Sequence, residues 1–444
     1  MPFDEPHGGV TSPCPARYLE HPYGRTQPSV VAMTKHVFAD RTAFVLAGGA
    51  ARGAYEVGVM QHVMEDVARD LGHDIRLDVL CGTSVGALNA CGLAAFADLG
   101  RNAIDRVVDV WTKLRVADLV RPDTRGILSM GARLLGRSGA AADLPPPREG
   151  GLIDPEGLER LVASSIPFHR IHENLLAGHL DAVTVSTTHI GSGRTIVYVH
   201  RREPELPTWS HDPTTVARAC HLTAQHALAS AAIPILFRAV KLDGAFHCDG
   251  GLRQNVPLSP ARRLGAGRVL VINPRYISTA PLDDRGAEDL FPSPLFVLGK
   301  TLNALLLDRI DTDLARLETI NRILGAGARI YGDGFVGALN AELGFAAGQG
   351  MRPMRALLVR ASQDIGRMAA EFVRSPAFAD ASGLSGRLIR RLADSESRHE
   401  ADLLSYVLFD GTFAGQLIEL GRADARARHD ALCAFFAKTP VDCS

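Results

Sequence analysis

Ser84 lies in the segment Gly82-Thr83-Ser84-Val85-Gly86, in which a glycine stands two residues before and two residues after a serine. A serine hydroxyl is a poor nucleophile until a base takes its proton, and a sharp strand-to-helix turn holds its oxygen clear of the backbone. Gly82 and Gly86 would relieve crowding around such a turn. The pattern therefore predicts a nucleophilic serine, with a helix N-cap in a close-packed turn as the alternative.

A glycine-rich turn follows the first apolar stretch of the chain. It consists of Gly48, Gly49, Ala50, Ala51 and Arg52. Backbone N–H groups in such a turn can point at the oxygen that becomes negative when an ester is attacked, which makes the turn a candidate oxyanion hole. A phosphate-binding loop is the alternative, but neither the G-x-G-x-x-G nor the G-x-x-x-x-G-K-[ST] spacing is present here.

A third motif places a carboxylate, Asp249, before Gly250 and Gly251. Asp-Gly is common turn chemistry, so Asp249 is either a simple turn residue or the base that activates the serine. A free aspartate is a weak base, and burial among apolar residues would raise its pKa and improve it as a proton acceptor. His226 and His247 are the alternative bases, for a Ser-His-Asp triad. The segment around Asp249 lacks the usual metal-ligand spacing, so we expect no metal.

Apolar strands and helices alternate around these motifs, which predicts a parallel sheet and an α/β fold. We expect a strand, a glycine turn and a helix from about residue 42, and a strand over 77–81 followed by a helix from 85. Further expected elements are a helix over 102–115, strands over 182–188 and 195–199, an alanine-rich helix over 214–233, and a strand over 269–272. Helices are expected near 355–373, 385–408 and 423–437.

We expect three regions in the chain. Residues 1–40 are rich in proline and are expected to form a disordered leader. Residues 41–275 are expected to form the catalytic α/β domain, and residues 276–444 a mainly helical region packed on or beside it. The segment 121–151 is dense in glycine and proline, and is expected to be either a mobile lid or a surface excursion with one short helix.

Composition bounds the class of protein. Hydrophobic residues make up 46%, charged residues 22%, and the formal net charge is −1, which describes a globular chain without a global field for nucleic acid or anionic lipid. Any membrane contact would have to be local. Seven cysteines, an odd number without a C-x-x-C pair, and an N-terminal segment broken by prolines favour a reducing, cytoplasmic location without export.

Taken in order along the chain, four motifs resemble those of the patatin-like phospholipases. They are the glycine-rich turn, Gly82–Gly86, Ser230–Pro234 and Asp249–Gly251. The resemblance covers about residues 45–272 and implies a three-layer core with a mainly parallel sheet. It also implies a Ser-Asp dyad, with Ser84 as nucleophile, Asp249 as base, an oxyanion hole at Gly48, Gly49, Ala50 and Ala51 with Arg52 beside it, and no cofactor.

One position departs from the family's pattern. The loops of the family usually carry a third glycine where this chain has Ala50. If that position needs a positive φ, alanine costs about 1 kcal/mol or more and misaims one N–H donor.

The resemblance implies a lipid acyl hydrolase of the phospholipase A, lysophospholipase or carboxylesterase type, acting on phospholipid or other acyl esters through an acyl-enzyme. The alternatives are an acyltransferase that uses the same acyl-serine, and a catalytically weak lipid-binding protein. Nucleic acid is not an expected partner, and peripheral contact with a membrane is left open. Head group, regiospecificity, chain length, oligomeric state, any activator and biological role are not determined by these residues.

Overall fold

The computed structural model describes residues 41–121, 151–277, 310–378 and 402–437, apart from positions 204, 208, 210–212, 255 and 346–349. It also describes the single positions 299, 301, 386, 389, 390 and 393. The expectations for residues 1–40 and for a lid over 121–151 therefore concern residues that lie almost wholly outside the described part.

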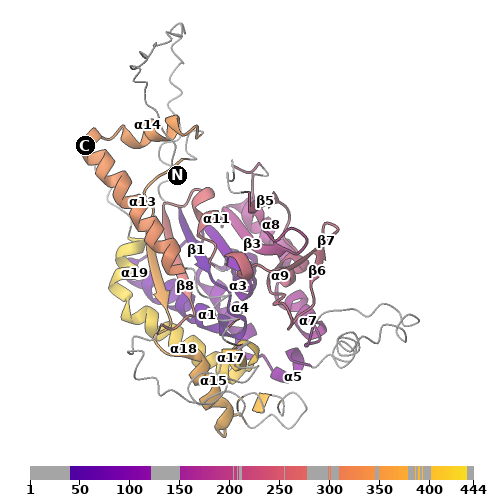
Figure 1. The fold of residues 1–444 in the computed structure, drawn as a ribbon. Coiled ribbons are helices and arrows are strands. Elements are labelled where there is room, and N and C mark those ends of the chain that lie inside the picture. Colours follow the sequence, from indigo (N-terminus) through magenta and orange to yellow (C-terminus); the bar gives the residue numbers. More distant parts are fainter. Residues whose placement is uncertain are drawn as a thin grey trace, which may run out of the picture. The chain divides into compact units, whose positions relative to one another are not determined.

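A nine-stranded, mainly parallel sheet forms the centre of the described chain (Figure 1). Its main path runs β5-β4-β3-β2-β1-β8-β9, and the hairpin of β6 and β7 joins it through β7, which pairs with β3. The strands are β1 (Thr42–Leu46), β2 (Val79–Thr83), β3 (Ala182–His189), β4 (Arg194–Arg201), β5 (Thr215–Ala219), β6 (Val240–Leu242), β7 (Ala245–Asp249), β8 (Arg268–Asn273) and β9 (Arg355–Arg360).

The central strands are buried on both faces. All five residues of β1 and of β2 are buried, as is typical of parallel strands covered by helices on either side. Phe44 and Leu46 belong to one apolar cluster, whereas Ala43 and Val45, which point the other way, belong to a second cluster. The sheet therefore separates two cores, and the expected three-layer α/β architecture is confirmed.

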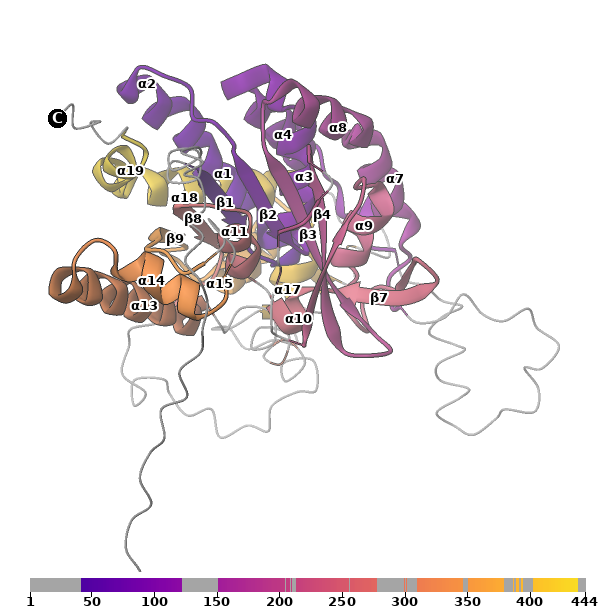
Figure 2. The same ribbon diagram turned by 90° about the horizontal axis from the view of Figure 1, so that it is seen from above.

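Helices supply the two outer layers, and Figure 2 shows them on either side of the sheet. The first cluster takes apolar residues from α1, α3, α4 and α18, and the second from α11 and α13. The α-helices are α1 (Gly53–His62), α2 (Ala68–Leu71), α3 (Val85–Ala95), α4 (Ala103–Thr112), α5 (Val116–Leu119), α7 (Glu156–Ser165), α8 (Phe168–Ala177), α9 (Ala224–Ser230), α10 (Gly251–Gln254), α11 (Leu258–Arg263), α13 (Ile310–Tyr331), α14 (Phe335–Glu342), α15 (Ile365–Arg374), α17 (Asp402–Val407), α18 (Gly411–Ala427) and α19 (His429–Phe436). Shorter turns of other helix types are η1 (Ala50–Arg52), η2 (Val63–Val67) and η3 (Ala97–Asn102). Among these helices none is long and apolar enough to cross a bilayer.

Helix α18, near the end of the chain, packs backbone against backbone on α1. A Cβ added at Gly58 would stand 1.9 Å from the carbonyl oxygen of Ile418, and one at Gly421 would stand 2.2 Å from that of Tyr55. The Tyr55 hydroxyl also donates a hydrogen bond of 3.0 Å to Asp424. These glycines are required by the close approach of the two helices, so the C-terminal helices complete the core on this side of the sheet.

Two secondary-structure expectations are wrong. The segment expected to be one helix over 214–233 begins with strand β5 and turns helical only at α9, and the helix expected over 355–373 begins with strand β9. Both strands lie at the ends of the sheet's main path, where pairing with β4 and with β8 overrides the helix propensity of their alanines and leucines. The strands expected over 182–188, 195–199 and 269–272 are confirmed as β3, β4 and β8.

Candidate active site

Ser84 lies at the sharp turn between β2 and α3. Its φ of 56° and ψ of −128° are a strained combination for a residue with a side chain. A Cβ on Gly82 would stand 2.3 Å from the carbonyl oxygen of Gly86, and one on Gly86 would stand 2.3 Å from that of Leu46. Ser84 does stand at the N-cap position of α3, as the alternative expected, but its side chain makes no capping hydrogen bond to that helix. The two glycines allow the tight turn, and the turn holds the serine oxygen away from the helix.

Asp249 ends strand β7 and faces the serine. The Ser84 hydroxyl donates a hydrogen bond of 2.5 Å to Oδ2 of Asp249, and the backbone N–H of Gly251 donates one of 2.7 Å to Oδ1. The carboxylate is fully buried, and this burial raises the pKa of Asp249 to about 7, although both hydrogen bonds oppose the rise. Asp249 is therefore a far better proton acceptor than an aspartate in water.

A buried serine from helix α9 holds the turn in place. The backbone N–H of Ser84 donates to Oγ of Ser230 at 2.8 Å, and the Ser230 hydroxyl donates to the carbonyl oxygen of Ser186 at 2.6 Å. Sequence reasoning noted Ser230 as part of a motif but gave it no role. These two hydrogen bonds link the turn at Ser84 to β3 and α9. The N–H of Ser84 is therefore already hydrogen-bonded within the protein.

The glycine-rich turn lies beside the turn that carries Ser84. Gly86 packs against the carbonyl oxygens of Leu46 and Ala47, the residues that lead from β1 into Gly48 and Gly49. Ala50 has a φ of 49°, so the position that departs from the family's pattern does adopt the left-handed conformation that favours glycine.

Ala50→Gly is expected to stabilise the protein by about 1 kcal/mol, because glycine adopts this φ without the clash that alanine suffers. Denaturant unfolding would measure the change. Ala51→Gly is the matched control: Ala51 is not among the residues with positive φ, so this variant should lose stability. Equal losses in both variants would contradict the strain at Ala50.

Arg52 ends the glycine-rich turn and is buried against the C-terminal region. Its side chain is only 4% exposed, its Nε donates to Oγ of Ser405 at 2.8 Å, and its guanidinium lies over the ring of Tyr406 at 4.3 Å. Ser405 and Tyr406 belong to α17, so a helix more than 350 residues later in the chain holds this end of the loop. These two contacts were missed because nothing local in the sequence marks them.

A buried polar network lies behind the loop. Asn89 on α3 donates to Oε2 of Glu56 at 2.9 Å, and its Oδ1 accepts from the indole N–H of Trp111 at 2.9 Å. Glu56 is fully buried, and burial raises the pKa of its carboxyl well above the usual range. The backbone of Ala47, just before the loop, also hydrogen-bonds to this carboxyl. The network ties the loop to α1 and α3 and was not foreseen from the sequence.

A largely apolar pocket lies between α3, α4 and α7. Its lining starts at Val85, the residue after Ser84, and includes neither Ser84 nor Asp249. Its lining includes Val85, Leu88, Gly92, Val107, Trp111 and Leu158. Such a lining can hold an aliphatic chain and offers little to a polar ligand.

The two histidines considered as alternative bases face other partners. Nδ1 of His226 lies 2.9 Å from Oγ1 of Thr223, and Nδ1 of His247 lies 2.9 Å from Oγ1 of Thr187. Burial lowers the pKa of His247 to about 4. The Ser84 proton is directed at Asp249 instead, so the geometry favours a dyad over a triad.

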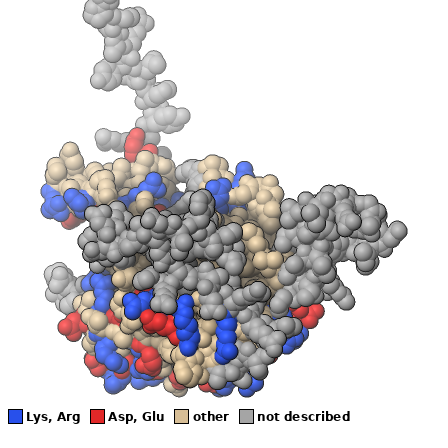
Figure 3. All heavy atoms as spheres, turned by 60° about the horizontal axis from the view of Figure 1, so that its bottom comes forward, with Lys and Arg blue, Asp and Glu red and all other residues tan. Residues whose placement is uncertain are grey.

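Among the described residues, one cluster of possible metal ligands lies apart from Asp249. One group of three ligand side chains, His172, His200 and His221, lies close enough together to hold an ion, and it does not include Asp249. In the described part of the face in Figure 3, basic and acidic side chains are interspersed, in keeping with the net charge of −1.

Of the comparisons with known proteins, the match to a family model is the informative one. The family model described as patatin-like phospholipase matches residues 44–262. No curated protein matches the chain. Among solved structures, the crystal structure of VipD from Legionella pneumophila is similar at 15% sequence identity and a TM-score of 0.29, over 86% of this chain and 67% of that one.

Proposed function

Residues 44–262 belong to the patatin-like phospholipase family of lipid acyl hydrolases, and on that premise we propose that this chain cleaves acyl esters with Ser84 as nucleophile and Asp249 as base. The observation that carries the proposal is the hydrogen bond of 2.5 Å from the Ser84 hydroxyl to the buried Asp249 carboxylate. A nucleophile within reach of a base of raised pKa is the arrangement that acyl transfer needs.

The reaction runs in two halves. As Oγ of Ser84 attacks the ester carbonyl, Asp249 takes the hydroxyl proton, and N–H groups of the turn at Gly48–Ala51 stabilise the negative oxygen. Collapse of the tetrahedral intermediate breaks the ester C–O bond, and protonated Asp249 returns its proton to the leaving alcohol. Water then attacks the acyl-serine by the same route and releases the fatty acid. Gly251, whose N–H holds Oδ1, keeps the other carboxylate oxygen aimed at Ser84.

The apolar pocket beside Ser84 is the proposed site of the acyl chain. It begins at Val85 and continues between α3 and α4, so a chain whose carbonyl lies at Ser84 would extend along it. Burial of each methylene contributes about 0.8 kcal/mol, which gives a preference for long chains.

Gly92→Phe is expected to shorten the preferred acyl chain, because a side chain at Gly92 would point at Val107 across the pocket. The ratio of kcat/KM for a C16 ester to that for a C4 ester should fall about tenfold or more, which corresponds to the loss of about two buried methylenes. The matched control is Gly415→Phe on α18, where an added Cβ meets nothing within 4 Å. An unchanged ratio would show that the acyl chain does not bind in this pocket.

Ester hydrolysis is expected to depend on the ionisation of Asp249. The pKa of Asp249 is about 7, and only its ionised form can accept the serine proton. The ionised fraction falls about tenfold for each pH unit below 7, and ionisation is nearly complete above pH 8. The value of kcat/KM should therefore rise with pH and level off, and far-ultraviolet circular dichroism would check that the fold persists. A flat profile from pH 5 to 8 would show that Asp249 is not the base.

The direct test is labelling of the wild-type chain by a fluorophosphonate, together with release of p-nitrophenol from acyl esters. Labelling with turnover supports the hydrolase. An acyltransferase would transfer the acyl group to an added alcohol or lysolipid, and product analysis would detect it. A lipid-binding protein without activity would bind vesicles but show neither labelling nor turnover.

Peripheral contact with a membrane is part of the proposal. Ile190 and Phe246 are 49% and 54% exposed, and they lie together because the N–H of Ile190 donates to the carbonyl oxygen of Phe246 at 2.9 Å. Lys241 lies 5.9 Å from the centre of the Phe246 ring, and Phe246 is three residues from Asp249. An apolar tip with a cation beside it suits the boundary between head groups and acyl chains.

A further inference from the structure

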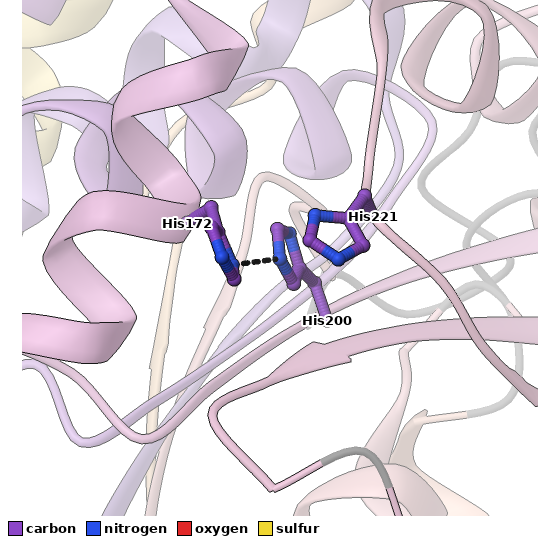
Figure 4. Close-up of side chains that lie close together, drawn as sticks. All are labelled: His172, His200 and His221. Atoms are coloured by element: carbon purple, nitrogen blue, oxygen red, sulfur yellow. Dashed lines mark hydrogen bonds between the residues drawn. The ribbon is translucent and has the colours of Figure 1, made fainter.

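Three histidines from separate elements meet at the end of the sheet away from Ser84 (Figure 4). His172 lies on α8, His200 near the end of β4, and His221 in the segment that leads to α9. One ring nitrogen from each lies within 4.8 Å of the others. We propose that these three imidazoles bind a divalent transition-metal ion, with Zn²⁺ as the best match.

The spacing of the rings suits a shared ion. Nε2 of His200 and Nδ1 of His172 are 3.3 Å apart, and two nitrogens bound to a tetrahedral zinc at about 2.0–2.1 Å are about 3.4 Å apart. The ring centres are 4.4, 4.7 and 5.5 Å apart, and rings bound to one ion have centres about 3.2 Å from it and hence about 4.5–5.5 Å apart.

The three side chains are of a type that binds transition metals. A histidine does so as the neutral imidazole, through a ring nitrogen that carries no proton. His200 is buried, whereas His221 is exposed and leaves a route for the ion from solvent. A set of three imidazoles without a carboxylate favours zinc, copper or nickel over magnesium or calcium.

Two hydrogen bonds oppose binding. The N–H of Leu222 donates to Nδ1 of His200 at 3.3 Å, which keeps the proton of this ring on Nε2, and Nε2 then donates to Nδ1 of His172 at 3.3 Å. An ion at Nε2 requires that proton to move to Nδ1 and both hydrogen bonds to break. Because both bonds are long, their loss lowers the affinity by about 10- to 100-fold, which is small against the affinity of zinc for a set of imidazole ligands.

The ion would not take part in ester cleavage. His200 pairs with Val183 near the start of β3, whereas Asp249 pairs with Thr187 four residues further on, a separation of about 13 Å along the strand. Its effect would be to tie α8 and β4 to the segment before α9, the helix that carries Ser230. The inference therefore stands independently of the proposed activity.

Calorimetric titration with Zn²⁺ of the tag-free, full-length protein, stripped with EDTA, tests the proposal. The expected result is one equivalent bound and a rise in melting temperature, with His172→Ala and His221→Ala each weakening binding about 10- to 100-fold. His73→Ala is the matched control, because the His73 ring hydrogen-bonds to the backbone oxygen of Asp74 and is not part of the cluster, so this variant should bind zinc like wild type.

Binding of Co²⁺ gives a second readout through visible absorption bands of imidazole-bound cobalt. These bands should appear on titration and be absent in His221→Ala. Because His221 is exposed, the fold should survive this substitution. Absence of zinc binding in the wild type, or equal binding by wild type and both cluster variants, would overturn the proposal. Neither outcome depends on whether the protein hydrolyses esters.

Discussion

Ser84→Ala is expected to abolish fluorophosphonate labelling and to reduce ester hydrolysis about 10⁴- to 10⁶-fold, because no other group can form the acyl-enzyme at this turn. Asp249→Asn is expected to reduce kcat about 10³-fold or more. Its amide keeps the shape of the carboxylate but cannot accept the serine proton. Both effects would be measured with p-nitrophenyl esters and with the labelling rate of the probe.

Stability needs a separate check for the Asp249 variant, because the carboxylate is fully buried and also accepts the N–H of Gly251. Circular dichroism and a melting curve would show whether the variant folds. The control for the serine is Ser192→Ala, an exposed serine in the turn between β3 and β4, which should keep full activity. Labelling that persists in Ser84→Ala would show that another residue is the nucleophile.

Arg52→Ala is expected to lower kcat about 10²-fold with little change in KM. The side chain of Arg52 holds the end of the proposed oxyanion turn through Ser405 and Tyr406, and loss of one aligned oxyanion donor costs rates of that order. Ser405→Ala removes the hydrogen bond to Nε and should cost about tenfold. Tyr406→Leu removes the ring that lies against the guanidinium and should also lower kcat.

A fall in kcat with little change in KM would show that Arg52 positions the oxyanion turn and does not merely stabilise the fold. Arg101→Ala is the control, because Arg101 forms an exposed ion pair with Asp74 and contributes little to stability. A variant at Arg52 or Ser405 that melts earlier but turns over at the wild-type rate would contradict the role of α17 in the site.

Much of the candidate site could be predicted because its chemistry lies in short contiguous turns. Gly82 and Gly86 mark a turn that has no room for a side chain, and the contacts of both glycines show why. The alanine at position 50 was expected to matter only if φ were positive there, and φ is 49°. Strands β1, β2 and β8 could also be predicted, because a strand buried on both faces requires a continuous apolar run.

The features that only the tertiary structure decided depend on contacts between residues that are far apart in the chain. Strand β9 and the contacts of Arg52 with α17 exist because the C-terminal third of the chain folds back over β8 and α1. Ser230, which accepts the N–H of Ser84 from 146 residues away, and the three histidines on α8, β4 and the segment before α9 have the same origin. Local periodicity reports which face of an element is apolar, whereas the partner of that face is set by strand order and helix packing over the whole chain. The tight turn at residues 82–86 could therefore be predicted from its own sequence, whereas the groups that hold it in place were decided by the fold.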